Sequence, residues 1–352
     1  MLEFHILNLK DLNMKLSIFV SLFSMVLLPF TAFTKDIENK PITVLKTNNK
    51  PFNTSYGTNN NHGWAFINYT VDEDAKLTGF EIINSSDFRE MEKDVAKFLS
   101  NLEFSPALVS GKPTSASNNY FFRLKFHRKK TTHSQVSRQF YKDYEMIQSL
   151  LDSKDLKNAE AELENIAEHR VKNWVEQAMY YWQQSQLHFY KNDWQNYGNY
   201  MDDVLSLSEY LPEPISVPAL QNAIEWYVHD KDYPRARLAL KRLEQVENVI
   251  LDDKTKQEYT LLIENPINDD SEIKVEKRLD KGNVFFRKLV RNSAVIELTK
   301  GSFTQAQLRC ANGLAKPLKN KDSYIFERNA FKNCHILLRT DEPTNFVLTQ
   351  KS

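Results

Sequence analysis

The stretch GWAFINYTV, residues 63–71, alternates the large side chains of Trp64 and Phe66 with smaller neighbours. A period of two is typical of a β-strand that buries one face. The acidic turn DEDA follows at residues 72–75, and residues 76–83 predict a second strand. The two strands and their turn therefore predict a β-hairpin.

A helix and a third strand complete this first segment. The SSD cluster at 85–87 is a good helix N-cap, and apolar residues recur at helical spacing from Phe88 until near Asn101. The stretch YFFRLKF at 120–126 predicts the third strand. The order strand, strand, helix, strand predicts a small α+β domain over residues 35–130, called the N-terminal module below.

The N-terminal module holds five motifs in a fixed order: GWAFI (63–67), VDEDAKL (71–77), IINSS (82–86), LEFSPA (102–107) and GKP (111–113). Their order and spacing resemble the C-terminal domain of TonB-type energy transducers. Ala75 stands where the family has a turn glycine, and Leu102 stands where it has a tryptophan. The long proline-rich spacer of such transducers is missing, since only Pro41 and Pro51 lie between the apolar segment near the N-terminus and Gly63.

The resemblance implies a domain that binds protein partners by adding strands at a sheet edge. The partners it implies are outer-membrane TonB-dependent receptors, and the role it implies is energy-dependent transmembrane transport. The missing spacer favours a scaffold or assembly role in the cell envelope. The candidate edge is the last strand: Tyr120, Phe121, Phe122, Arg123, Leu124, Lys125 and Phe126.

An apolar run near the N-terminus predicts export. Residues 16–30 (LSIFVSLFSMVLLPF) carry no charge and follow Met14-Lys15, which gives them the length and flank of a signal-peptide core. We expect an export signal over residues 1–34, with Met14 as a candidate start. The alternatives are a retained membrane anchor, with membrane contact through residues 16–30, and a buried helix. Export or anchoring places the remaining chain in the periplasm or on the periplasmic side of the inner membrane.

The middle segment, residues 135–265, has a repeat of 38–39 residues. The stretches KDLKNA (154–159), NDWQNY (192–197) and KDYPRA (231–236) superpose, and each has an aspartate before a large apolar residue. Aspartate at that place caps a helix, so each unit predicts a helical hairpin. The pattern resembles tetratricopeptide-like arrays, and a plain helical bundle is the alternative.

Aromatic residues gather in this middle segment. They either line a ligand groove or pack between repeats, and packing is the commoner arrangement. The residues are Trp174, Tyr180, Tyr181, Trp182, Phe189, Tyr190, Trp194, Tyr197 and Tyr200.

The last segment, residues 266–352, has several short strand patterns separated by turn residues, which predict a small β-sandwich. It also holds Cys310 and Cys334, the two cysteines of the chain. In an exported protein such a pair predicts one disulfide, which stabilises by ~3 kcal/mol in the chain-entropy model. Two separate buried thiols are the alternative.

The sequence has no recognisable catalytic or cofactor motif. Its eight glycines are too widely spaced for a dinucleotide-binding or P-loop motif, and two glycines never flank a serine in the pattern of a nucleophile elbow. The eight histidines form no zinc-protease motif. Lys plus Arg equals Asp plus Glu at 46 each, so no basic excess predicts nucleic-acid binding.

We therefore predict an α+β multidomain protein with no cofactor and no metal. Its parts are an export signal (1–34), a TonB C-terminal-like module (35–130), a tetratricopeptide-like helical array (135–265) and a β-rich domain (266–352). The predicted function is a non-enzymatic envelope protein with a protein-interaction domain, in TonB-type transport or envelope assembly. One alternative is a membrane-anchored energy transducer acting on outer-membrane receptors. A further alternative is an envelope hydrolase with a helical substrate groove.

Overall fold

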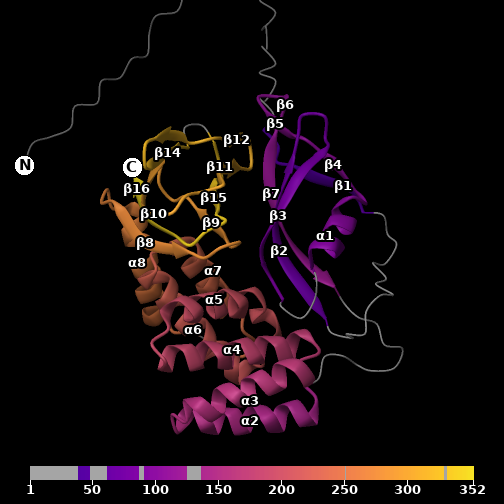
Figure 1. Cartoon of the computed structure of the whole chain (residues 1–352), viewed down its shortest axis with the longest axis vertical. Helices are drawn as coiled ribbons and strands as arrows, with labels where there is room; N and C mark the ends of the chain where they lie inside the picture. The colour runs from indigo at the N-terminus through magenta and orange to yellow at the C-terminus, as the bar shows by residue number, and fades with distance from the viewer. Residues whose placement is uncertain (1–38, 48–61, 87–90, 125–135, 250, 329–330) are drawn as a thin grey trace, which may run out of the picture. The chain divides into compact units, whose positions relative to one another are not determined.

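The computed structural model describes residues 39–47, 62–86, 91–124, 136–249, 251–328 and 331–352 (Figure 1). Helices and strands are mixed, as the α+β prediction requires. The apolar run at 16–30 and residues Lys125 and Phe126 of the predicted edge strand lie outside the described residues. Among the helices that are described, none combines the length and the apolar character needed to cross a membrane.

The N-terminal module is built on a three-stranded antiparallel sheet with strand order β3-β2-β7. The strands are β2 (Gly63–Val71), β3 (Leu77–Ser85) and β7 (Ala116–Leu124), and α1 spans Met91–Leu99. The predicted hairpin is present, because β2 pairs with β3. Its turn places Ala75 in the left-handed region at φ 65°. The Asp72 carboxylate supports the turn by accepting hydrogen bonds from the Asp74 and Lys76 amides at 3.0 and 2.8 Å.

Four short strands of the module were not expected from the sequence. They are β1 (Thr43–Thr47), which pairs with β4 (Leu102–Ser105), and β5 (Ala107–Val109), which pairs with β6 (Lys112–Thr114). β4 and β5 lie on either side of Pro106, and β1 lies upstream of the hairpin. Strands of three to five residues carry too few alternations to be recognised by period.

The two faces of the module sheet are buried against different partners. On one face, Ala65, Ile67 and Tyr69 of β2 share a core with Val95 and Leu99 of α1. On the opposite face, Trp64 belongs to the core of the helical segment, where it stacks on Phe121 and meets the ring of Tyr181 edge-on. Because both faces of the module sheet are covered, only its two edge strands can pair with a further strand.

The middle segment consists of helices that pack in consecutive pairs, α2 on α3, α4 on α5 and α6 on α7. Their bounds are α2 (Arg138–Asp152), α3 (Leu156–His169), α4 (Trp174–Tyr190), α5 (Trp194–Ser206), α6 (Glu213–His229), α7 (Tyr233–Leu243) and α8 (Asp253–Asn268). A short 3₁₀ helix, Ser208–Tyr210, precedes α6.

The turns inside the three helix pairs have one geometry. Asp155, Asp193 and Asp232 each cap the second helix by accepting a hydrogen bond from the amide three residues on, as the sequence predicts. The residue before each aspartate is left-handed, and each aspartate amide donates to the carbonyl five residues earlier. The left-handed residues are Lys154 (φ 59°), Asn192 (φ 55°) and Lys231 (φ 56°), and the accepting carbonyls belong to Leu150, His188 and Tyr227.

The last segment forms two antiparallel sheets that share one hydrophobic core. The first has strand order β13-β14-β10-β16-β8, and the second has strand order β12-β11-β15-β9. Their bounds are β8 (Ile273–Leu279), β9 (Val284–Lys288), β10 (Ser293–Lys300), β11 (Gln305–Cys310), β12 (Gly313–Ala315), β13 (Leu318–Asn320), β14 (Ser323–Glu327), β15 (His335–Arg339) and β16 (Thr344–Lys351).

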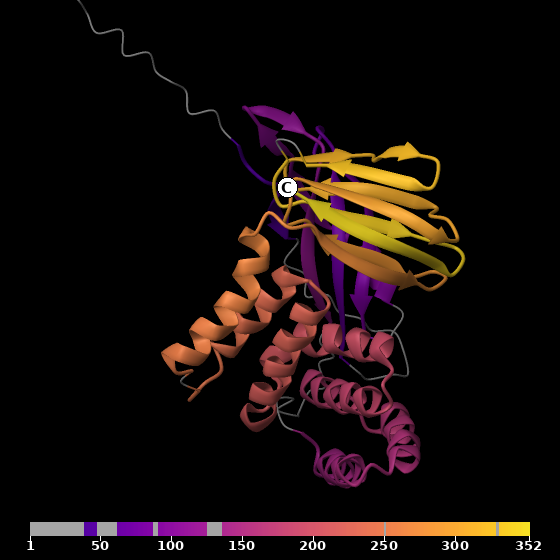
Figure 2. The same ribbon diagram turned by 90° about the vertical axis from the view of Figure 1, so that its left-hand side faces the viewer.

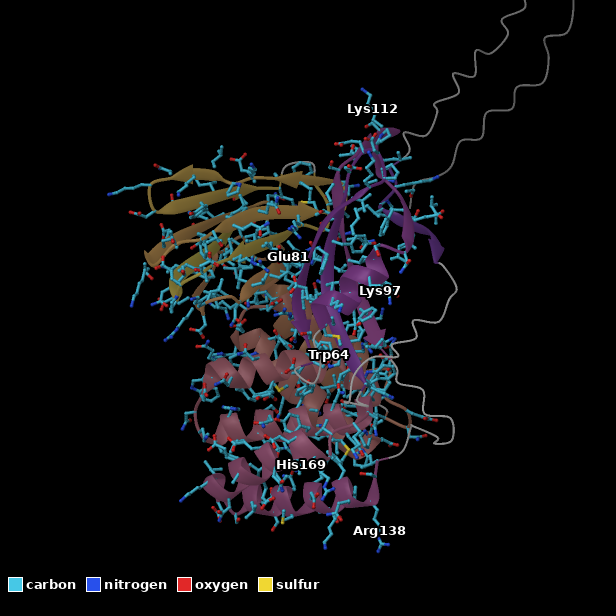
Figure 3. All side chains as sticks on the ribbon, turned by 45° about the vertical axis from the view of Figure 1, so that its right-hand side comes forward. Trp64, Glu81, Lys97, Lys112, Arg138 and His169 are labelled. Atoms are coloured by element: carbon cyan, nitrogen blue, oxygen red, sulfur yellow. A yellow bond between two sulfur atoms is a disulfide. The ribbon has the colours of Figure 1, made fainter. Side chains whose placement is uncertain are left out.

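The four-stranded sheet lies with its outer face against the module sheet (Figures 1 and 2). Phe66 meets Phe286 edge-on with ring centroids 6.4 Å apart. Arg309 donates to the Asn68 side-chain oxygen at 2.8 Å. The order of layers is thus α1, module sheet, four-stranded sheet and five-stranded sheet. Figure 3 shows Glu81 on the side of the module toward these C-terminal sheets and Lys97 on the opposite side.

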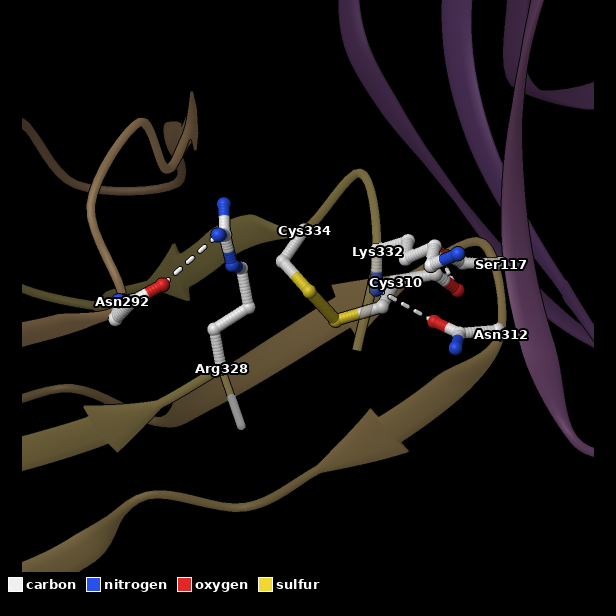
Figure 4. Close-up of a disulfide and its surroundings, with 7 residues drawn as sticks. All are labelled: Ser117, Asn292, Cys310, Asn312, Arg328, Lys332 and Cys334. Carbon is white, nitrogen blue, oxygen red and sulfur yellow. Dashed lines mark hydrogen bonds between the residues drawn. A yellow bond between two sulfur atoms is a disulfide. The ribbon is translucent and has the colours of Figure 1, made fainter. Parts of the chain in front are cut away.

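The predicted disulfide between Cys310 and Cys334 is present. It joins the end of β11 to the residue before β15, and both cysteines are fully buried (Figure 4). The Cys310 carbonyl accepts a hydrogen bond from the Ser117 hydroxyl of β7 at 3.3 Å. The disulfide therefore closes the loop that carries β12, β13 and β14 at the place where the last segment meets the N-terminal module.

Replacing both cysteines by serine should lower the free energy of unfolding by about 3 kcal/mol, since the closed loop would no longer restrict the unfolded chain. Urea denaturation of the two proteins measures the difference. A reducing agent should destabilise the wild type and leave the double variant unchanged. Equal midpoints for the oxidised wild type and the double variant would contradict the expectation.

Candidate functional site

A cleft of about 1340 Å³ opens where the three segments meet, and we call it the junction cleft. Its walls are β3 of the module, α5 and the α6–α7 turn of the helical segment, and β8–β9 of the last segment. Small-molecule pockets are typically ~300–1,000 Å³. The junction cleft is larger, so its size suits a macromolecular segment better than a metabolite.

Three edge strands line the junction cleft. β3 is an edge of the module sheet, β8 is an edge of the five-stranded sheet, and β9 is an edge of the four-stranded sheet. An edge strand presents backbone N–H and C=O groups that its own sheet does not pair. Backbone groups at the edges of three separate sheets therefore lie along the cleft and can form hydrogen bonds with a ligand.

The floor of the cleft is a network of charged side chains on the α6–α7 turn and β8–β9. Asp230 forms ion pairs with Arg287 and Lys277. Asp232 lies 3.3 Å from the Arg287 guanidinium and 3.4 Å from that of Arg235. Arg287 and Asp232 each have a side chain only 3% exposed, so the charges are compensated by each other and not by water.

The network extends into α5 through Asp202. Arg235 lies 3.2 Å from the Asp202 carboxylate, and the Tyr227 hydroxyl donates to that carboxylate at 2.8 Å. Three carboxylates therefore face three cations, which gives the network no net charge. Such a balanced set of buried charges ties the helical segment to the last segment.

Burial and pairing act in opposite directions on the pKa values of this network. Burial raises the pKa of Asp202, and the nearby Arg235 only partly offsets the effect. Burial also opposes ionisation of Asp230, but Arg287 and Lys277 outweigh it and lower the pKa of the Asp230 carboxyl. Burial lowers the pKa of Lys277 despite its pairing with Asp230.

The repeat shows why the third turn holds the last segment. Asp230 occupies the place that Ser153 and Lys191 have in the first two turns. Lys231 adds a second tie, because its ammonium donates to the Lys274 carbonyl on β8 at 2.9 Å. The repeat pattern alone does not predict this role, although the departure at Asp230 is visible when the three turns are superposed.

Some aromatic residues of the middle segment line the junction cleft, and others pack in the helical core. Trp194 and Tyr200 line the junction cleft, and Trp194 is 48% exposed. The side chains of Tyr180, Tyr181 and Trp182 are buried in the helical core. Packing is therefore confirmed for part of this group, and a ligand groove stays a prediction for the residues that line the cleft.

The predicted edge strand corresponds to β7, whose strand neighbour among the described residues is β2. Tyr120 is 38% exposed, whereas Phe122 is buried against the α1 side of the sheet. Phe121 packs on Trp64, and Arg123 forms an ion pair with Glu209. The sheet therefore has two edges, β7 and β3, and both contribute to the lining of the junction cleft, β3 through residues 80–85 and β7 through Phe121 and Arg123.

Metal and cofactor sites were not expected, and within the residues described here no group of three His, Cys, Asp or Glu side chains is placed to hold a metal ion. His188 lies 3.0 Å from Asp193 and stacks on Tyr200. Comparison of the chain with protein-family models and with curated proteins gave no match.

Asp232→Asn should destabilise the protein by roughly 2–3 kcal/mol, since Arg287 and Arg235 would lose a charged partner in a buried place. Asparagine still caps a helix, so the cap itself is kept. Asp155→Asn is the matched control at the same position of the first turn, and it should cost less than ~0.5 kcal/mol. Equal losses of unfolding free energy in the two variants would show that Asp232 acts only as a cap.

His335 should make stability depend on pH. Burial and the neighbouring Lys288 lower the pKa of His335 to about 4, and its ring stacks on Phe286 at 4.5 Å. In the unfolded chain His335 binds a proton near pH 6.5, and in the folded chain it binds one only near pH 4. The free energy of unfolding should therefore fall by ~3 kcal/mol between these pH values as the solution is acidified.

Denaturation at several pH values measures this dependence as the difference between wild type and His335→Gln. In His335→Gln, the pH dependence of the unfolding free energy should lack the contribution of His335. His229→Gln, at an exposed position on α6, controls for the loss of a histidine. A wild-type slope that survives in His335→Gln would contradict the assignment.

Proposed function

We propose that this chain is a non-enzymatic protein of the cell envelope that binds an extended segment of a protein partner along β7. The observation that carries the proposal is the position of β7, an edge strand of the module sheet. Adding a strand to such an edge uses backbone hydrogen bonds for affinity and alternate side chains for specificity.

The burial of both faces of the module sheet supports this mode of binding. One face packs on α1, and the other packs on the helices and the four-stranded sheet. A partner could reach those faces only by displacing segments of the same chain. The exposed ring of Tyr120 marks a place on β7 where a partner side chain could rest.

The proposed location and role rest on the sequence. The disulfide fits an oxidising compartment such as the periplasm, and the apolar run at 16–30 fits export or anchoring. The resemblance of residues from about 40 to 127 to the TonB C-terminal domain suggests a role in TonB-type transport or in envelope assembly. The helical pairs, as a tetratricopeptide-like array, and the two C-terminal sheets, as a β-sandwich, would hold the module in place.

The test places a photo-crosslinking amino acid at position 120 of the full chain. The variant is expressed in cells that also make its natural envelope partners. We expect a specific adduct, and its identity decides the role: an outer-membrane receptor supports transport, and another envelope protein supports assembly. The same amino acid at Tyr141, an exposed tyrosine of α2, is the control and should give no such adduct.

Tyr120→Glu should reduce the yield of a partner captured by affinity purification, because it adds a charge at the edge where the strand would pair. Tyr141→Glu should not. Identical recovery of the partner with both variants, or identical adducts from both positions, would refute binding at β7.

A further inference from the structure

We propose that the junction cleft is a second binding site, which takes an extended polypeptide segment added to β3. This inference rests on the proposed mode of binding, strand addition, but not on β7. In this mode the backbone of the ligand forms hydrogen bonds with β3 and gives the affinity, and the side chains of the ligand give the specificity.

The size and direction of β3 fit such a ligand. The residues of β3 that line the cleft run from Phe80 to Ser85, which is a length of ~20 Å at about 3.3 Å per residue. Within the described part of the chain, β3 pairs with β2 and with no other strand, and residues 80–85 of β3 line the cleft. A segment of five or six residues would pair along it.

Two side-chain contacts hold β3 in position before any ligand arrives. Glu81 accepts a hydrogen bond from Arg339 of β15 at 2.7 Å, and Asn84 donates to Asp203 of α5 at 2.7 Å. The strand is thus tied to β15 and to α5. A preorganised edge loses less conformational entropy on binding than a mobile one.

The lining of the cleft carries charged side chains of both signs, so it does not favour a ligand of one charge. The network of Asp230, Asp232 and Arg287 is compensated internally, and Glu81 is paired with Arg339. The exposed ring of Trp194 offers an apolar surface on the α5 wall. We therefore infer a ligand that alternates apolar or small side chains with polar ones, as edge-pairing segments do.

The test uses a phage-displayed library of linear dodecapeptides selected on the full chain. The selected peptides should bind the wild type and slow hydrogen exchange of the amides in Leu77–Ser85. Asn199→Trp places a bulky ring at an exposed position of α5 that lines the cleft, so it should weaken peptide binding at least tenfold.

The repeat supplies the matched control. Ala161 occupies the corresponding position of α3, five residues after Leu156 as Asn199 is five after Trp194, and it is exposed outside the cleft. Ala161→Trp should leave peptide affinity unchanged. Thermal unfolding of both variants checks that neither substitution disturbs the fold.

The β7 variant separates this inference from the proposed function. Peptides whose binding is lost in Tyr120→Glu but kept in Asn199→Trp would overturn the cleft site and support β7. Peptides lost in Asn199→Trp and kept in Tyr120→Glu are the expected result. A selection that enriches no peptide, or peptides that protect amides outside β3, would also overturn the inference.

Discussion

The contact between the module sheet and the four-stranded sheet constrains the rest of this structure. It places Asn68 and Ser117 of one sheet against Arg309 and the Cys310 carbonyl of the other, with each polar group hydrogen-bonded. Buried polar groups are costly unless they are paired. This interface therefore requires one register between the two sheets, and it fixes the walls of the junction cleft.

The same contact limits what the N-terminal module can do. Its sheet is covered on both faces, so its remaining capacity for binding lies at the β7 and β3 edges. β7 has an exposed ring at Tyr120, while β3 forms a wall of the cleft. Tyr120 of β7 does not line the cleft, whereas residues 80–85 of β3 do, and this difference is the physical basis for assigning the two edges to separate binding events.

Local features of the fold were predictable, and contacts between segments were not. The hairpin at 63–83, the aspartate caps at 155, 193 and 232, and the disulfide follow from period, cap chemistry and cysteine number. Asp230 and Arg287 are 57 residues apart, and no pattern in the sequence links them. Likewise, an asparagine at 68 looks like a solvent-facing strand residue until Arg309 is known to cover it.

Burial of the module sheet joins the three segments into one cooperative body, and the described residues from 39 to 352 belong to a single compact unit. Native-state hydrogen exchange with increasing denaturant tests it most directly, by following amides in β2, α6 and β15 together. The account predicts that all three lose protection at the same denaturant concentration with one unfolding free energy. Loss of protection in β15 well before or after β2 would contradict it.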